Sequence, residues 1–406
     1  MSRNESIYLD WAATSPPDRS ILEECLDLSC SSFGNPSSTH GRGKEAGLLL
    51  ENTRNSLAGT IENTGHNESR RPNAKPRGTI VFTGSGTEAD QIPLLAVLRA
   101  ALSKPAGIRD CHMVVTAIEH PAVFAQAKLL EQLGIRLSVV NPEANGQVEP
   151  EKIRKALCPQ TRLVAVMAVN NETGAVQNIG EIGRLVQEAR KALGYREILF
   201  HVDYVQALGK LRFSLDPALV GSAAFSAHKI GGPRGAGALW LSKEMEVLGA
   251  GGGQEGGMRS GTENLFGALA FARCAVKAAE NLEERLVKAR RLEAALIEGI
   301  RKIPGARILP EGRMPGDQGF SPWIISVAFP GLSGEVLARA LSDEGIAVST
   351  GSACSHLERK RGHRVLDAMG IHPELSFSSL RISTGESTGA DDIEYFLAKA
   401  ADLYRR

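Results

Sequence analysis

Lys229 stands in the sequence setting that is best suited to covalent chemistry. It ends the segment Ala-Ala-Phe-Ser-Ala-His-Lys at 223–229 and precedes Ile-Gly-Gly-Pro-Arg-Gly. Ligands of α/β proteins lie at the carboxyl ends of strands, where this apolar segment places the lysine. A partly desolvated lysine has a lowered pKa and can form a Schiff base. The alternative is a solvated surface lysine, and the flanking Ser226, His228 and glycines favour the chemical role.

A carboxylate follows another apolar segment, in Phe-His-Val-Asp at 200–203. A carboxylate at the end of such a strand can keep the nitrogen of a pyridine ring protonated, which turns the ring into an electron sink. Asp203 could equally cap the next helix. The two interpretations remain open on this segment alone.

A run of small residues, Phe-Thr-Gly-Ser-Gly-Thr-Glu at 82–88, separates an expected strand from an expected helix. The amides and dipole of a helix N-terminus suit a phosphate group. The run lacks the Gly-Lys-Thr/Ser ending of a P-loop. An ordinary capped helix start is the alternative.

Three further residues could take part in chemistry. His120, just past an expected strand, could lie flat on an aromatic ring or transfer protons, or it could be structural. Cys354 lies in Thr-Gly-Ser-Ala-Cys-Ser and is followed by basic residues that would favour a thiolate; otherwise it is an incidental loop cysteine. Arg381 interrupts an apolar stretch and could bind a carboxylate through two N–H groups or form a buried ion pair.

The composition is that of a globular protein larger than one ordinary domain. The chain has 406 residues, 42% of them hydrophobic and 23% charged, and a formal net charge of +1. This balance gives no indication of nucleic-acid or membrane binding, and no apolar run is long enough to span a bilayer. No signal or transit peptide is recognisable, so we expect a cytoplasmic protein. The six cysteines contain no C-x-x-C pair, and we expect the five other than Cys354 to be reduced thiols.

Between about 80 and 240, apolar segments alternate with amphipathic ones, which predicts an α/β layer on a mostly parallel sheet. The expected strands are 79–82, 113–116, 137–140, 163–168, 198–202, 223–225 and 238–241; the expected helices are 88–102, 122–133, 150–157 and 179–193. Beyond about 265 the pattern indicates a smaller α+β domain. Its expected parts are a long helical stretch at 265–303, strands at 323–329 and 347–349, and helices at 334–344 and 391–404, with the strand-like 7–9 joining it or capping the interface.

In combination and in this order, these segments resemble the class V aminotransferase-like family of fold type I enzymes that use pyridoxal 5'-phosphate (PLP). Within it they are most similar to cysteine desulfurases. The matching motifs run from Tyr-Leu-Asp-Trp-Ala-Ala-Thr at 8–14 to Arg381, nearly the whole chain. The resemblance implies a large PLP-binding domain at 15–264 with a seven-stranded sheet. A small domain, 1–14 and 265–406, would carry the catalytic cysteine loop.

The resemblance also implies a role for each matching residue. Lys229 would bind PLP through a Schiff base, Cys354 would be the catalytic thiol, and His120 would stack on the ring and help move protons. The remaining cofactor-binding matches are Gly86, Thr87, Ser226 and His228 for the phosphate, Asp203 for the ring nitrogen, Gln206 for the phenolic oxygen, Asn171 beside substrate and cofactor, and Thr262 for the phosphate of a neighbouring subunit. Asn35, Asn171 and Arg381 match substrate-binding residues. No metal ligand is implied.

The implied reaction converts L-cysteine to L-alanine and leaves the sulfur on Cys354 as a persulfide. The sulfur would pass to an acceptor such as an iron–sulfur scaffold protein or a thiolation carrier, and the enzyme would be a homodimer. A selenocysteine lyase, another C–S lyase or a transaminase of the same family is the alternative, and Cys354 argues against a plain transaminase. A non-catalytic scaffold is disfavoured by the joint presence of Lys229, Asp203, His120 and Cys354.

Several segments depart from the family pattern. Ala89-Asp90-Gln91 replaces the usual residues after the phosphate motif, and Tyr204 stands where a small residue is common. Tyr204 could narrow the pocket or point away from it. The segment Gly-Gly-Gln-Glu-Gly-Gly at 252–257 lacks the His and Arg that some members have, and the polar stretch 62–78 is predicted to be a surface insertion between a helix and a strand.

Overall fold

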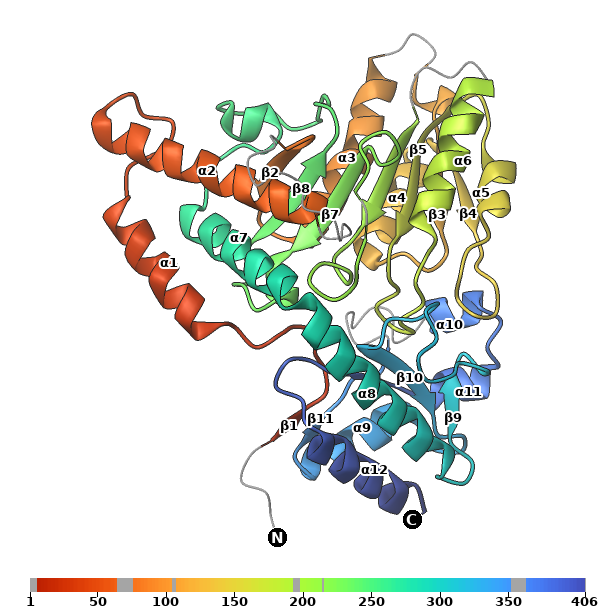
Figure 1. Cartoon of the computed structure of the whole chain (residues 1–406). Coiled ribbons are helices and arrows are strands. Elements are labelled where there is room, and N and C mark those ends of the chain that lie inside the picture. Colours follow the sequence, from red (N-terminus) through yellow and green to blue (C-terminus); the bar gives the residue numbers. More distant parts are fainter. Residues whose placement is uncertain are drawn as a thin grey trace.

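The computed structural model describes residues 6–63, 76–103, 107–192, 198–213, 215–351 and 363–405. Seven strands form one central sheet in the order β2-β8-β7-β6-β5-β3-β4 (Figure 1). Their bounds are β2 Thr79–Thr83, β3 His112–Thr116, β4 Arg136–Val140, β5 Thr161–Met167, β6 Leu199–Asp203, β7 Ser222–Ser226 and β8 Gly237–Leu241. Strand β8 runs antiparallel to its neighbours β2 and β7, and the other pairs are parallel. The predicted mostly parallel seven-stranded sheet is confirmed.

Helices cover both faces of this sheet (Figure 1). They are α1 Arg19–Ser31, α2 Gly41–Asn63, α3 Gly86–Leu102, α4 Pro121–Gln132, α5 Pro150–Ala156, α6 Ile179–Ala192 and α7 Leu265–Glu280. Successive side chains of a strand point to opposite faces, so each strand contributes to two cores. Val164 and Val166 of β5 pack in the core with α2, α6 and α7, whereas Leu163 and Ala165 pack with α3 and α4. This double burial explains why the strands are apolar throughout.

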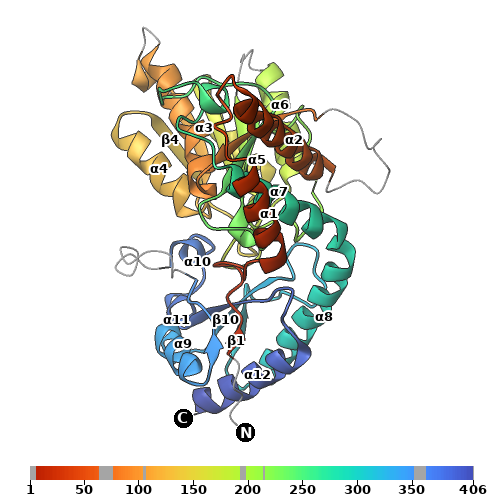
Figure 2. The ribbon, with the colours of Figure 1, turned by 90° about the vertical axis from the view of Figure 1, so that its left-hand side faces the viewer.

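The C-terminal part builds a second, smaller sheet with its own core (Figure 2). Strand β10 (Ile324–Ala328) lies antiparallel between β9 (Arg307–Leu309) and β12 (Ser379–Ser383). The helices are α8 Leu282–Arg301, α9 Gly334–Asp343, α10 Arg364–Ala368, α11 Pro373–Phe377 and α12 Ala390–Arg405. The N-terminal β1 (Ile7–Tyr8) pairs in parallel with β11 (Ile346–Ala347), which favours the first of the two alternatives for these residues.

The helical stretch predicted at 265–303 is two helices rather than one. Helix α7 ends before Asn281, whose backbone is not helical and whose side-chain Nδ2 donates to the carbonyl of Lys277 (3.0 Å). An asparagine side chain that bonds to nearby backbone competes with helix continuation. The polypeptide turns there and α8 leads into the C-terminal part.

Glu62 joins the two ends of the segment between α2 and β2 through hydrogen bonds. This carboxylate is buried and accepts hydrogen bonds from the backbone N–H groups of Arg77 (2.9 Å) and Gly78 (2.8 Å) and from Trp240 Nε1 (3.0 Å). Positions 64–75 of the predicted insertion lie outside the described residues. Within the described part of the chain, no helix is both long and apolar enough to cross a membrane.

Candidate active site

A cavity of about 210 Å³ lies where the strands of the large sheet end and the C-terminal part meets them. Its lining brings together Ala12, Ala13, Ser85, Gly86, Thr87, Asp90, His120, Met167, Asn171, Asp203, Val205, Gln206, Ser226, His228, Lys229 and Arg381. Nine of the ten residues predicted to bind a cofactor are in this set. The segments after β2, β3, β5, β6 and β7 supply them because parallel strands end at one edge of a sheet.

Lys229 lies in the short 3-10 helix Ala227–Lys229 that follows β7. Its Nζ donates to the carbonyl oxygens of Ala12 (2.6 Å) and Ala13 (2.8 Å). Both acceptors belong to the N-terminal segment, whose Ala12 N–H is bonded to Ser383 Oγ of β12 (2.9 Å). The reactive amine is therefore held between the large sheet and the C-terminal part.

Asp203 ends β6 and its carboxyl group forms part of the cavity wall. Oδ1 accepts the backbone N–H of Val205 at 2.8 Å. Burial, reinforced by the neighbouring Asp90 carboxyl, raises the pKa of Asp203 to about 8. A cationic ring nitrogen beside this carboxyl would reverse the shift, because an opposite charge favours the ionised form.

Further titratable groups lie behind Asp203, and the sequence analysis assigned them no role. His201, two residues earlier on β6, contacts Asp90 Oδ1 through Nε2 (3.1 Å) and Ser222 Oγ through Nδ1 (2.9 Å). Burial lowers the pKa of His201 to about 4 and raises the pKa of Asp90 well above its usual value. For His201, the sequence signal was the period of two along β6, which puts residues 201 and 203 on one face of the sheet.

The part of the cavity lined by the start of α3 suits a phosphate group. Helix α3 begins there at Gly86, and the side chain of its cap, Ser85, accepts the N–H of Glu88 (3.1 Å). Ser226 Oγ is buried and has no hydrogen-bond partner in the described structure. An unpartnered buried hydroxyl is costly, and a phosphate oxygen would satisfy it. The nearby His228 is held by Thr14 Oγ1, 3.1 Å from its Nδ1.

His120 caps helix α4 and lines the cavity. Its Nδ1 accepts the backbone N–H of Ala122 at 3.2 Å, so the neutral ring carries its proton on Nε2. Burial lowers the pKa of His120 to about 4, with further contributions from Lys229, Arg364 and Arg381. A neutral imidazole can pack flat on an aromatic ring and accept a proton.

Arg381 reaches the cavity from β12 and is almost fully buried. It donates to Asp10 Oδ1 (2.8 Å) and to the carbonyl of Asn171 (3.0 Å), while its buried Nε bonds to none of the described residues. A guanidinium group with a spare donor can bind a carboxylate. Asp10, for which the sequence analysis gave no role, therefore helps to position Arg381. Asn171 lies inside the turn that Asn170 Oδ1 fixes by accepting the N–H groups of Glu172 and Thr173.

Among the described residues, two predicted site residues, Asn35 and Thr262, do not line this cavity. Asn35 is exposed, and its Oδ1 accepts the N–H of Ser37 at 2.9 Å. Thr262 is also exposed, and Cys354 lies outside the described residues. The roles of all three stay predictions.

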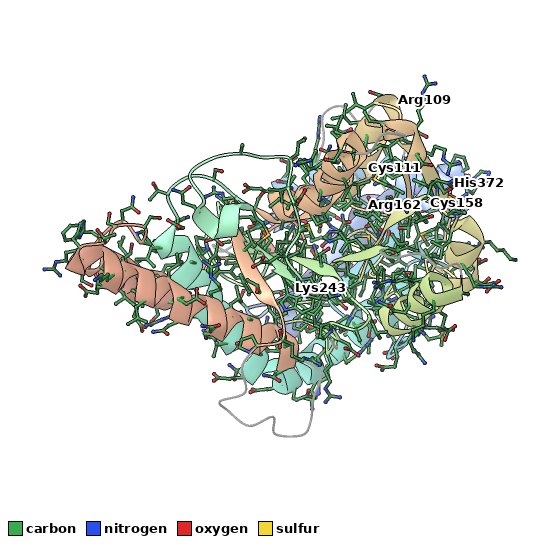
Figure 3. The ribbon with its side chains drawn as sticks, turned by 90° about the horizontal axis from the view of Figure 1, so that it is seen from above. Arg109, Cys111, Cys158, Arg162, Lys243 and His372 are labelled. Atoms are coloured by element: carbon green, nitrogen blue, oxygen red, sulfur yellow. The ribbon has the colours of Figure 1, made fainter. Side chains whose placement is uncertain are left out.

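The remaining cysteines lie elsewhere and are free thiols: Cys25, Cys111 and Cys274 are buried, Cys158 is half-buried and Cys30 is exposed. Cys111 and Cys158 precede β3 and β5, at the end of the sheet opposite the cavity (Figure 3).

Tyr204 points away from the cavity. Its ring packs 4.5 Å from that of Phe213 and is stacked 5.8 Å from that of Phe225, inside the core. The residue therefore leaves the pocket unchanged, which settles the alternatives that the sequence left open.

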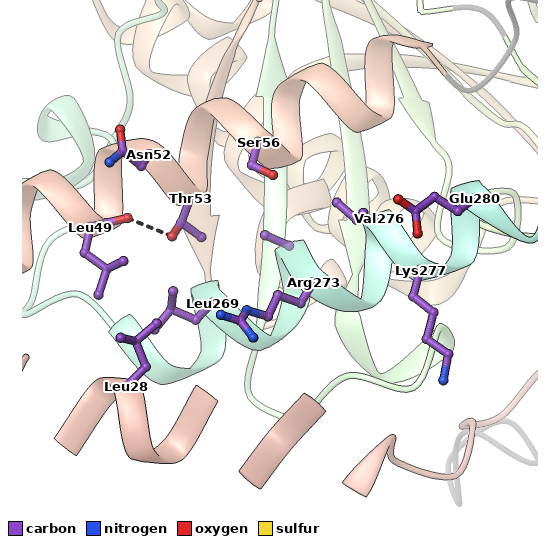
Figure 4. Close-up of a pocket in the computed structure, with 11 residues that line it drawn as sticks. Leu28, Leu49, Asn52, Thr53, Ser56, Leu269, Arg273, Val276, Lys277 and Glu280 are labelled. Carbon is purple, nitrogen blue, oxygen red and sulfur yellow. Dashed lines mark hydrogen bonds between the residues drawn. The ribbon is translucent and has the colours of Figure 1, made fainter. Parts of the chain in front are cut away.

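A larger groove, about 490 Å³, lies between α1, α2 and α7 (Figure 4). Leucine, alanine and valine side chains line much of it, with Arg273, Lys277 and Glu280. It contains none of the predicted site residues.

Comparison with known proteins agrees with this geometry. The family model described as aminotransferase class-V matches residues 7–396. A cysteine desulfurase of Bradyrhizobium diazoefficiens is 34% identical and is covered over 96% of its length by 100% of this chain. A putative cysteine desulfurase, IscS 1, of Bacillus subtilis is also 34% identical, with 99% of each chain covered.

Solved structures give the same result. A NifS-like protein has a TM-score of 0.84 at 33% identity, and the match covers 98% of this chain and 99% of the other. SspA in complex with cysteine has a TM-score of 0.73 at 25% identity, with 93% and 98% covered. The resemblance drawn from the motifs and the predicted fold type I architecture are thus confirmed. This chain belongs to the aminotransferase class-V family.

Proposed function

We propose that the chain is a PLP-dependent cysteine desulfurase. The observation that carries the proposal is the single cavity in which Lys229, Asp203, His120 and Arg381 meet. Lys229 would hold PLP covalently, Asp203 would face the ring nitrogen, and Ser226, His228 and the start of α3 would hold the phosphate. When bound, PLP supplies a ring that withdraws electrons from the bonds of the substrate Cα.

The residues of the cavity divide the remaining tasks. Arg381 would bind the carboxylate of L-cysteine, with Asn171 beside it and Asn35 as a further ligand. The Lys229 amine, once released from PLP, would move the proton at the substrate Cα. Neutral His120 would stack on the ring and accept or return a proton through its outer nitrogen. Buried Asp203 would keep the ring nitrogen protonated.

Cys354 would receive the sulfur. Its thiolate attacks the substrate sulfur and forms the S–S bond of a persulfide, while the Cβ–S bond breaks. The carbon fragment keeps that electron pair and, once protonated, is released as alanine. The persulfide can then pass its outer sulfur to an acceptor thiol.

The relatives support cysteine as the substrate, because several are named cysteine desulfurases and one solved neighbour is described in complex with cysteine. The IscS name suggests an iron–sulfur scaffold protein as the sulfur acceptor. A homodimer would bring Thr262 of one subunit to the phosphate of the other. We further propose two domains, 15–264 and 1–14 with 265–406.

The decisive experiment supplies the PLP-loaded protein with L-cysteine and a reductant and measures sulfide and alanine together. We expect equal amounts from the wild type and loss of both in Cys354→Ala. If the PLP-loaded wild type formed neither product, the desulfurase proposal would fail, and selenocysteine and cysteine sulfinate would be tried next. A fully active Cys354→Ala variant would instead indicate a lyase that releases sulfur directly.

A further inference from the structure

Lys210 is a buried lysine beside the candidate active site for which the proposed reaction has no task. Its side chain is only 6% exposed, and none of the ion pairs among the described residues includes it. Burial lowers its pKa well below the usual value, and the nearby cations Lys229, Arg285 and Arg381 lower it further. Burying an amine in such surroundings is costly, so a compensating interaction is expected.

That interaction is with Gln206, one turn earlier in the chain. Lys210 Nζ donates to Gln206 Oε1 at 2.7 Å. The other end of the same amide, Nε2, donates to the carbonyl of Ala12 at 2.9 Å, and this carbonyl also accepts from Lys229 Nζ at 2.6 Å. A continuous hydrogen-bonded chain thus runs from Lys210 through Gln206 and Ala12 to Lys229.

This series of hydrogen bonds fixes the orientation of the Gln206 amide. The Ala12 carbonyl can only accept, so it requires the amide nitrogen, and the amide oxygen at the other end accepts from Lys210 Nζ. Gln206 also lines the cavity, and Nε2 keeps a second N–H beyond the one bound to Ala12. Because the Gln206 amide oxygen faces Lys210, the group that Gln206 presents to the cavity is an N–H donor and not an acceptor.

Contacts from both parts of the molecule hold Lys210 in place. Its carbonyl accepts the indole N–H of Trp323 (2.8 Å), which precedes β10, and its own N–H bonds to the carbonyl of Ala207 (3.0 Å). Lys210 and Lys229 also border a second cavity of about 280 Å³, with Trp11 and Arg285. The backbone at Lys210 is therefore fixed, and its amine has a defined position relative to Gln206.

We propose that Lys210 is a positioning residue that orients the Gln206 amide so that an N–H faces the phenolic oxygen of PLP. The proposal rests on the proposed function, since it presumes PLP in the first cavity. A hydrogen bond donated by Gln206 would stabilise the negative phenolic oxygen. That oxygen would then attract the proton of the Lys229–PLP linkage less strongly. Loss of Lys210 should therefore raise the pKa of this linkage.

The test is a pH titration of the visible absorption of the PLP-loaded protein. We expect Lys210→Met to raise the pKa of the absorption change by about one unit. Gln206→Leu should give a similar rise, and the double variant should show no more than Gln206→Leu alone. Lys210→Gln, which keeps an N–H donor, should stay near the wild type. Lys128→Met, which removes an exposed lysine of α4, is the control and should change nothing.

Three results would overturn the proposal: an unshifted Lys210→Met, additive shifts in the double variant, or a shift in Lys210→Gln as large as in Gln206→Leu. The last comparison stands even if Lys210→Met fails to fold. A wild type that binds no PLP at all would refute the proposed function instead, so the two failures are distinguishable.

Discussion

At the scale of single residues, the site depends on buried groups whose charge differs from that in water. Asp203 and Glu119 have pKa values of about 8 and 7, raised chiefly by burial, whereas His120, His201 and His228 have values of about 4. Near neutral pH, therefore, all three histidines are uncharged, and Asp203 binds its proton tightly until a cation approaches.

These pKa values predict how the stability of the PLP-free protein depends on pH. A carboxyl with a raised pKa in the folded state stabilises the protein fully below its unfolded value, and this stabilisation is lost as pH rises through the folded value. The histidines oppose this only below about pH 6.5, their unfolded pKa. Between pH 6.5 and 8 we therefore expect Asp203 to lower the free energy of unfolding by up to ~1.4 kcal/mol per pH unit, while buried Lys210, whose pKa is lowered, contributes in the opposite direction.

Denaturant unfolding at several pH values measures this slope. Asp203→Asn, which cannot titrate, should lack the negative contribution, so its slope should be more positive than that of the wild type across the same window. Equal slopes for the two proteins would show that Asp203 is already ionised before PLP binds.

At the scale of elements, the N-terminus of α3 must approach β7 closely to form the phosphate end of the cavity. A Cβ on Gly86 would lie 3.0 Å from Val205 Cγ2 and 3.1 Å from Ser226 Cβ. We predict that Gly86→Ala weakens PLP binding by ~10-fold, because forcing a methyl group into packed surroundings costs about 1–3 kcal/mol.

Equilibrium titration with PLP checks this prediction. Gly59→Ala is the matched control, because a Cβ at this position of α2 meets nothing within 4 Å. It should leave PLP affinity unchanged and add a little helix stability. If Gly86→Ala bound PLP as tightly as the control, α3 would not form the phosphate site.

The junction between α2 and β2 provides a second test at this scale. Glu62→Gln replaces one carboxylate oxygen by a donor that faces other donors, so we expect a loss of about 1–3 kcal/mol in the free energy of unfolding. Glu45→Gln, on the exposed side of α2, should change it by less than about 0.5 kcal/mol. Similar losses of unfolding free energy in the two variants would mean that the hydrogen bonds of Glu62 do not stabilise this junction.

At the scale of the whole molecule, a buried arginine joins the C-terminal part to the loop that presents Asn171. Arg313 donates to the carbonyls of Thr173 (3.0 Å) and Ile324 (2.8 Å) and pairs with Glu293 Oε1 at 2.7 Å. Both side chains of the pair are fully buried. The contact fixes how the second sheet sits against the cavity.

Without Arg313, the buried Glu293 would keep only Arg290 as a cationic partner among the described residues (2.9 Å) and would lose the bond at Oε1, and three backbone carbonyls would lose their donor. Arg313→Met is therefore expected to lower the free energy of unfolding by about 3–5 kcal/mol. The exposed Arg339→Met on α9 should have little effect. Thermal or denaturant unfolding measures both, and a loss below about 1 kcal/mol in Arg313→Met would contradict this account of the contact.

The sequence predicted much of this architecture because its strands are buried on both faces and therefore apolar. The motifs likewise placed Lys229, Asp203 and His120 at strand ends, where the structure finds them together. The break at Asn281 was missed because the apolar pattern continues on both sides of it. The contacts of Asp10 with Arg381 and of His201 with Asp90 join residues far apart in the chain, and no local pattern reports such contacts.

The most direct test of the central claim is to locate the cofactor. The protein would be loaded with PLP, reduced with borohydride to fix the linkage, digested and examined by mass spectrometry. We predict that the pyridoxyl phosphate group is found on the peptide containing Lys229 and is absent in Lys229→Ala. Attachment to Lys210 or any other lysine, or no attachment at all, would contradict the account.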